Sequence, residues 1–175
     1  MPAPPSSRWS PVAWDATHTL DAATADELLE AARWSPSAGN SQPWSFVTAL
    51  RGDAVHRALL PALAASSRRW APDAALLVVN VCHRYVEGTD WDYSEFAEYD
   101  LGQSVAHMTL HASSLGLHSR QFRAFDRTRV ESVLAVPPHW VAMTMTAIGR
   151  PAPDVPAPDR VRRPLDELRL PPPGP

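Results

Sequence analysis

Residues 31–46 restrict the fold more than any other stretch, because they begin as the end of a helix and finish as the start of a strand. Pro36 ends the helix, since its ring clashes with the preceding turn, and Pro43 favours an extended chain. The nine residues between Trp34 and Trp44, SPSAGNSQP, contain no charged side chain. Their hydroxyls, amides and backbone N–H groups can bond a flat heteroaromatic ligand without burying a charge. A polar helix-to-strand connection without a ligand is the alternative interpretation.

The order of residues in this loop resembles a signature of the nitroreductase family of flavin enzymes. The string WSPS at residues 34–37 is followed by Asn40 and by QPW at residues 42–44. In that family the loop packs against the isoalloxazine ring of FMN at a homodimer interface, so that one subunit's loop serves the other subunit's flavin. The resemblance therefore implies a homodimer with the flavin at the subunit interface. The loop residues that it assigns to the flavin are Pro36, Ser37, Ala38, Asn40 and Gln42.

Arginines at both ends of the chain match the family's phosphate site. Residues 8–15, RWSPVAWD, resemble its opening segment, whose first arginine and serine bind the FMN phosphate. On this match Arg8, Trp9 and Ser10 are flavin-binding residues. Residues 159–165, DRVRRPL, resemble its closing basic motif, which assigns Arg160 and Arg162 to the same phosphate. Without the match, these residues form a solvated basic tail or a polyproline ligand for another domain.

Two positions depart from the family pattern. Val12 stands where many members carry a lysine or arginine near the pyrimidine edge of the flavin, and Arg68 or Arg69 is a candidate replacement. Residues 121–124, QFRA, stand where members often have Glu-Gly or Gly-Gly, and backbone N–H groups there reach flavin N5. Arg123 and Ala124 can donate the same N–H groups, although alanine costs more than glycine if the turn needs a positive φ.

The composition excludes several classes of function. The chain has 175 residues, which suits a single domain, and a formal charge of −3, which gives no reason to expect nucleic acid or an anionic membrane as partner. All sixteen basic residues are arginine, so lysine Schiff-base chemistry and a P-loop lysine are excluded. Cys82 is the single cysteine, so no intramolecular disulfide is expected. No signal-peptide core and no 18-residue apolar run exist, which predicts a cytoplasmic protein without a membrane partner.

Hydrophobic periodicity predicts alternating helices and strands. We expect a helix that begins at a capping box at residues 24–27 and ends before Pro36, and a long central helix at residues 94–117. Residues 74–82 are almost continuously apolar, which predicts a strand buried on both faces. The remaining elements are strands at 44–50, 118–122 and 140–149 and helices at 53–66 and after Asp126.

The resemblance extends over roughly residues 8–168 and implies an α+β fold of three layers. Helices flank a central, mostly antiparallel sheet. We expect a disordered lead at residues 1–7, one FMN-binding domain at residues 8–151, and a proline-rich arm at residues 152–175 that carries the phosphate-site arginines.

His107 and His111 have the i, i+4 spacing of a two-histidine metal site. No glutamate follows His107, and no third ligand is evident, so we expect packing at a dimer contact and no metal.

The family resemblance implies an FMN-dependent oxidoreductase. NADH or NADPH transfers a hydride to flavin N5, and a nitroaromatic, quinone or free flavin then takes the electrons as the small-molecule substrate. No nucleophile motif of the Gly-x-Ser-x-Gly type is present. One alternative is an FMN-dependent oxidase that acts on a natural-product or peptide-derived substrate with oxygen as acceptor. Another alternative is a non-catalytic flavin-binding dimer module. Residues 84–99, which would cover the flavin, contain no motif that identifies the substrate.

Overall fold

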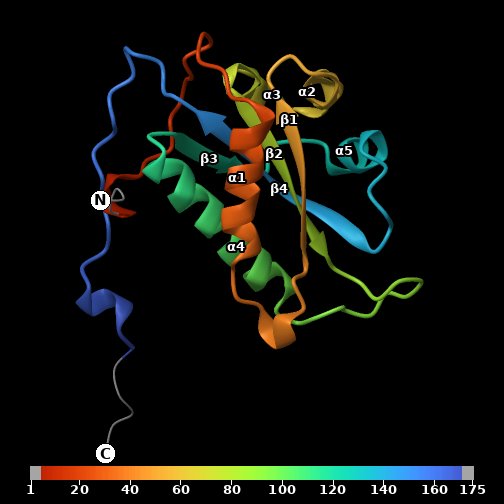
Figure 1. Ribbon diagram of the computed structural model, residues 1–175. Coiled ribbons are helices and arrows are strands. Elements are labelled where there is room, and N and C mark those ends of the chain that lie inside the picture. Colours follow the sequence, from red (N-terminus) through yellow and green to blue (C-terminus); the bar gives the residue numbers. More distant parts are fainter. Residues whose placement is uncertain (1–4, 171–175) are drawn as a thin grey trace, which may run out of the picture.

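A four-stranded antiparallel sheet forms the middle layer of the protein (Figure 1). The computed structural model describes residues 5–170. The strand order is β1-β2-β4-β3, which places β2 and β4 in the centre and leaves β3 at an edge. The strands are β1 (Trp44–Leu50), β2 (Leu76–His83), β3 (His118–Phe122) and β4 (Trp140–Gly149).

Strand β2 is buried on both faces, as its apolar run predicts. It pairs with β1 from Trp44 opposite Cys82, and with β4 from Leu76 opposite Ile148. The β2–β4 register shifts between Asn80 and Val81. Burial raises the pKa of the Cys82 thiol to about 11, so this cysteine is a core residue rather than a nucleophile.

Helices cover both faces of the sheet. Helix α1 (Ala22–Arg33) and helix α4 (Ala97–Ser114) lie together on one face in Figure 1. The opposite face carries α2 (Ala54–Leu59) and α5 (Arg127–Val133), beside the short α3 (Ala65–Arg68). Side chains alternate along β2, so that Leu76 and Val78 pack under α1 and α4, whereas Leu77 and Val79 join the core on the other side. This arrangement is the predicted three-layer α+β fold.

The predicted cap of α1 is wrong by three residues. The N-cap is Asp21, whose carboxylate accepts hydrogen bonds from the backbone N–H of Thr24 at 2.8 Å and from its hydroxyl at 2.7 Å. Thr24 therefore lies inside the first turn rather than before it. The helix ends at Arg33, three residues before Pro36, as predicted.

The predicted helix at residues 53–66 is interrupted. Asp53 caps α2 by accepting from the backbone N–H of His56, but α2 ends at Leu59, and the turn Leu60–Ala62 is a 3₁₀ helix. Pro61 explains the break, because it lacks an N–H and its ring crowds the carbonyl group four residues earlier. The apolar spacing continues past this break, which is why periodicity alone predicted one helix.

Helix α4 begins three residues after the predicted start, and Gly116 follows its end with a φ of +73°. Its 18 residues give a length of about 27 Å, close to the diameter of a small domain. Residues at the two ends of this helix are therefore too far apart to contact one ligand group together.

The N-terminal arm and the end of β4 lie side by side. The N–H of Asp15 donates to the carbonyl of Arg150 at 2.9 Å, and the N–H of Ala152 donates to the carbonyl of Ala13 at 3.2 Å. Gly149 packs against Trp14, whose ring would lie 3.4 Å from an added Cβ atom. These contacts bring the segment that carries Arg8 close to the start of the C-terminal arm.

The C-terminal arm is exposed and extends along one side of the molecule, with one 3₁₀ turn at Asp166–Leu168 (Figure 1). Four residues of the predicted disordered lead, 1–4, and the last five residues of the arm lie outside the described residues, and Pro5–Ser7 forms a 3₁₀ turn. The division at residue 151 into a domain and an arm stays a prediction. Within residues 5–170 no helix is both long and apolar enough to cross a membrane.

Candidate active site

Three arginines from opposite ends of the chain line one cavity. Arg8, Arg160 and Arg162, together with Ser6, surround a volume of about 430 Å³. These are the arginines that the sequence assigned to a phosphate. Ser10 is next to the cavity, because the Arg8 Nη1 atom donates to its Oγ atom at 3.3 Å.

The chemistry of this cavity suits a phosphate dianion. Each guanidinium carries five N–H donors and stays charged at any physiological pH, and no carboxylate is among the described residues that line the cavity. Among residues 5–170, Arg162 donates to one group, the carbonyl of Val161 at 2.8 Å, and its other donors remain available. Three like charges repel one another in the free protein, so a dianion between them stabilises the arrangement.

Trp9 packs on the edge of His118 at the start of β3, with ring centroids 5.1 Å apart. Burial, and secondarily the charge of Arg8, lowers the pKa of His118, so its imidazole is neutral at pH 7. His118 was predicted only as a strand residue. Its contact with Trp9 links residues more than a hundred positions apart, and the sequence contains no signal for it.

Arg123 and Ala124 follow the end of β3. The Ala124 carbonyl accepts from the N–H of Ala64 at 3.0 Å and from the hydroxyl of Ser67. Within residues 5–170 the amide N–H groups of Arg123 and Ala124 have no hydrogen-bond partner, so both can donate to a ligand. Ala124 is not among the residues with a positive φ, so alanine carries no left-handed strain at this turn.

The loop at residues 35–43 holds an unusual number of left-handed residues. Gly39, Asn40 and Gln42 have φ values of 58°, 56° and 46°. Glycine adopts this conformation without strain, but glutamine seldom does, and a left-handed non-glycine residue costs on the order of 1–3 kcal/mol. A loop that maintains this strain is typical of a binding site.

Hydrogen bonds fix the loop to itself and to α4. The N–H of Ala38 donates to the Asp100 Oδ2 atom at 2.9 Å, and the N–H of Gln42 donates to the Ser37 Oγ atom at 3.0 Å. Asp100 is only 2% exposed, and it lies in the first turn of α4, where the helix dipole stabilises a carboxylate. Sequence reasoning missed Asp100, because nothing in a helical pattern reveals which carboxylate faces a distant loop.

Replacing Asp100 by alanine is expected to loosen the loop. A hydrogen bond to a charged acceptor contributes about 1.5–3 kcal/mol, so exchange of the Ala38 amide hydrogen should accelerate about 10- to 100-fold. Hydrogen exchange measured by NMR checks this. Gln103→Ala is the control, since Gln103 donates to the other carboxylate oxygen of Asp100 at 3.2 Å and does not contact Ala38. Unchanged protection of Ala38 in Asp100→Ala would show that the loop is held by other contacts.

The two histidines of α4 contact α1 and the loop of the same chain. His107 Nδ1 forms a short hydrogen bond with the Ser35 hydroxyl, and His111 Nε2 lies 2.9 Å from the Glu27 carboxylate. The described part of the chain contains no group of three or more metal-ligating side chains. The histidines thus fasten α4 to α1 within the subunit.

The predicted flavin residues form two groups at opposite ends of α4. The loop lies against Asp100 in the first turn of the helix, whereas the arginine cavity lies beside His118, just after the helix ends. A helix of about 27 Å separates them. The structure therefore brings Arg8 together with Arg160 and Arg162, but does not bring the loop to them within one chain.

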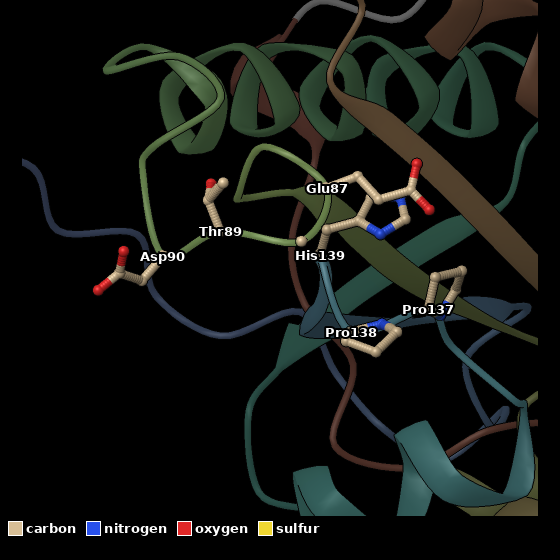
Figure 2. Close-up of a pocket in the computed structure, with 7 residues that line it drawn as sticks. Glu87, Thr89, Asp90, Pro137, Pro138 and His139 are labelled. Atoms are coloured by element: carbon tan, nitrogen blue, oxygen red, sulfur yellow. The ribbon is translucent and has the colours of Figure 1, made fainter.

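A larger hollow, of about 640 Å³, lies away from both groups. It is formed by residues 87–90 and by Pro137, Pro138 and His139, and Figure 2 shows the Asp90 side chain pointing away from the two prolines. None of the residues assigned to the flavin lines it. Size therefore does not identify the site here.

Comparison with known proteins identifies the family. A model of the nitroreductase family matches residues 6–150. The chain belongs to the nitroreductase family. An NADH dehydrogenase of Thermus thermophilus is 30% identical to it over 154 residues, or 72% of this chain and 75% of that protein. A 5,6-dimethylbenzimidazole synthase of Rhodospirillum rubrum is 29% identical over 168 residues, or 82% of this chain and 78% of that protein.

Solved structures of the nitroreductase fold superimpose closely. An oxidoreductase described as containing FMN has a TM-score of 0.84 and 24% identity, and the match covers 97% of this chain and 91% of that chain. A nitroreductase-family protein from Streptococcus pneumoniae has a TM-score of 0.78 and 18% identity, with 93% and 95% coverage. The resemblance inferred from the loop is confirmed, and this nitroreductase-family protein is an oxidoreductase.

Proposed function

We propose that the protein is a homodimeric, FMN-dependent NAD(P)H oxidoreductase that reduces a nitroaromatic, quinone or flavin acceptor. The observation that carries the proposal is the cavity shared by Arg8, Arg160 and Arg162, since it is built for a phosphate group and uses both ends of the chain. The related NADH dehydrogenase supports the choice of electron donor, and the structurally similar oxidoreductase described as containing FMN supports the choice of cofactor.

The residues present fit FMN. The arginine cavity would hold the phosphate, and the free N–H groups of Arg123 and Ala124 would donate to the ring. Bound FMN supplies hydride acceptance at N5 and delivery of the electrons to the acceptor. The chain's own contribution is to position the ring, to exclude water from its face, and to offer donors that do not move when charge develops. No side chain is required as a nucleophile.

A second copy of the chain completes the site. The loop and the arginine cavity lie at opposite ends of α4, so a twofold dimer can supply the loop of one subunit to the cavity of the other. Large aromatic side chains beside the loop favour such a contact. Phe96 and Tyr99 line a hollow with Pro36 and Ser37, and Trp34 directly precedes the loop. Trp34, Phe96 and Tyr99 are 74%, 47% and 68% exposed.

The dimer is tested by its mass. Light scattering should give about twice the 19.2 kDa of one chain at micromolar concentration, with or without FMN. A stable monomer with full flavin occupancy would contradict a site shared between subunits.

A second candidate is an FMN-dependent oxidase that acts on a natural-product or peptide-derived substrate, with oxygen as acceptor. It is favoured by the relative named as a 5,6-dimethylbenzimidazole synthase, whose name indicates synthesis rather than reduction.

One experiment separates the candidates. The purified protein should be yellow, and acid precipitation should release FMN. Anaerobic NADH or NADPH should then bleach the flavin absorbance within the turnover time, and a nitroaromatic or quinone should restore it. If neither nicotinamide bleaches the flavin while oxygen rapidly reoxidises dithionite-reduced protein, the oxidase is the function. Colourless protein that does not bind added FMN would contradict both candidates.

A further inference from the structure

Arg120 occupies the corner where the N-terminal arm meets β3. Its Nη1 atom donates to the carbonyl of Pro11 at 3.0 Å, and the centre of its guanidinium lies 4.3 Å from the centre of the Trp70 ring. Phe122 supports the same ring edge-on, with centroids 4.9 Å apart. A guanidinium stacked on an aromatic face and bonded to a buried residue's carbonyl has little rotational freedom. The next residue after Pro11 is Val12, which is 60% exposed.

This corner lies between the two groups that would hold the ends of FMN. The N-terminal arm follows β3, since Trp9 packs on His118 and Pro11 bonds Arg120 two residues further along each segment. Arg8 at the start of the arm lines the phosphate cavity. The free N–H groups of Arg123 and Ala124 come just past the end of β3. A flavin that reaches from the cavity to these N–H groups passes Arg120.

We infer that Arg120 supplies the positive charge at the flavin ring that Val12 does not provide. The inference rests on the proposed function, because it requires FMN in this site. It replaces Arg68 as a candidate. Arg68 donates to the carbonyls of Pro61 at 3.2 Å and Leu63 at 2.7 Å, which holds it at the turn before α3.

The chemistry explains why a charge is needed there. Adding a hydride to the flavin adds two electrons and one proton, so the ring gains one net negative charge, which is concentrated at N1 and the C2 carbonyl. A fixed cation at that edge stabilises the reduced flavin more than the oxidised flavin. Only one of the five Arg120 donors is bonded within the described residues, and the others remain for the ring.

The test measures the flavin midpoint potential and the affinity for oxidised FMN in Arg120→Gln. Oxidised FMN should bind within threefold of wild type. Reduced FMN should bind about tenfold more weakly, which lowers the two-electron potential by about 30 mV. Adding Val12→Lys to Arg120→Gln should restore most of that loss. A purely structural role would weaken both redox forms equally and leave the potential unchanged, and that result would overturn the inference.

Two further proteins keep the test decisive. Arg51→Gln is the matched control, since Arg51 also bridges backbone carbonyls, those of Asp73 and His18, but lies after β1 at the other edge of the sheet. Its potential should equal that of wild type. Val12→Lys in the wild-type background keeps Arg120, so it still tests the inference if Arg120→Gln does not fold. It should change the potential by less than 10 mV or so, because the charge is already present; a rise of 30 mV or more would show that the site lacks a cation. Wild-type protein that binds no FMN would instead refute the proposed function itself.

Discussion

Arg162→Ala is expected to raise the dissociation constant for FMN about 10- to 100-fold. One charge-assisted hydrogen bond to a phosphate contributes about 1.5–3 kcal/mol, and each 1.4 kcal/mol corresponds to a factor of ten. Arg162 lines the cavity with Arg8 and Arg160, so its loss removes about a third of the positive charge there. Isothermal titration of apoprotein with FMN measures the change.

Arg163→Ala is the matched control for this prediction. It removes the same charge from the next residue, which does not line the cavity. Its affinity for FMN should stay within about twofold of wild type, because an exposed charge outside the site is screened by water and salt. Equal losses in the two variants would indicate a diffuse electrostatic effect of the arm. An unaltered affinity in Arg162→Ala would remove Arg160 and Arg162 from the site.

Leu28→Ala is expected to lower the free energy of unfolding by about 2–5 kcal/mol. Leu28 lies on the buried side of α1, is fully buried, and belongs to the core formed with Leu76, Val78 and Met108. Truncation leaves a cavity that the surrounding side chains fill only in part. Because α1 leads directly into the loop at residues 35–43, the variant should also lose order in that loop.

Urea unfolding followed by circular dichroism, at constant flavin concentration, measures the change in the free energy of unfolding. Leu29→Ala is the control, since the neighbouring leucine is half-buried and its truncation should cost about 1 kcal/mol. A Leu28→Ala protein as stable as Leu29→Ala would mean that α1 is not fixed by this contact.

Most of the strands were predictable because they have a local sequence signal. The apolar run of β2 identifies a central strand, since a strand covered on both faces is almost entirely apolar. The edge strand β3, HSRQF, has no comparable pattern, and it was located mainly by its place after the glycine that ends α4. The helix interrupted at Pro61 shows the limit of this approach, because the apolar spacing continued through a residue that cannot donate a backbone hydrogen bond.

The candidate site was predictable only where the family pattern is a run of adjacent residues. The loop from Pro36 to Gln42 and the two arginine motifs were assigned in this way. Residues that reach the site from other elements were missed, namely Asp100, His118 and Arg120. Each contacts a partner more than fifty positions away in the chain. Neither hydrophobic periodicity nor motif spacing shows which distant residues meet in space.

The sequence by itself determined where most helices and strands lie, the absence of lysine chemistry and the strings that mark the family, because these depend on local preferences and on which residues are present. The layered α+β fold followed from the family resemblance that those strings carry. The tertiary structure brings Arg8, Arg160 and Arg162 together around one cavity, as the resemblance implied. Only the tertiary structure decided that the loop lies at the other end of α4 and that Arg120 reaches Pro11 beside Val12. The physical reason is that charge, hydrogen bonding and close packing act over a few ångströms in space. The chain sets those separations only after the sheet has paired and both of its faces are covered.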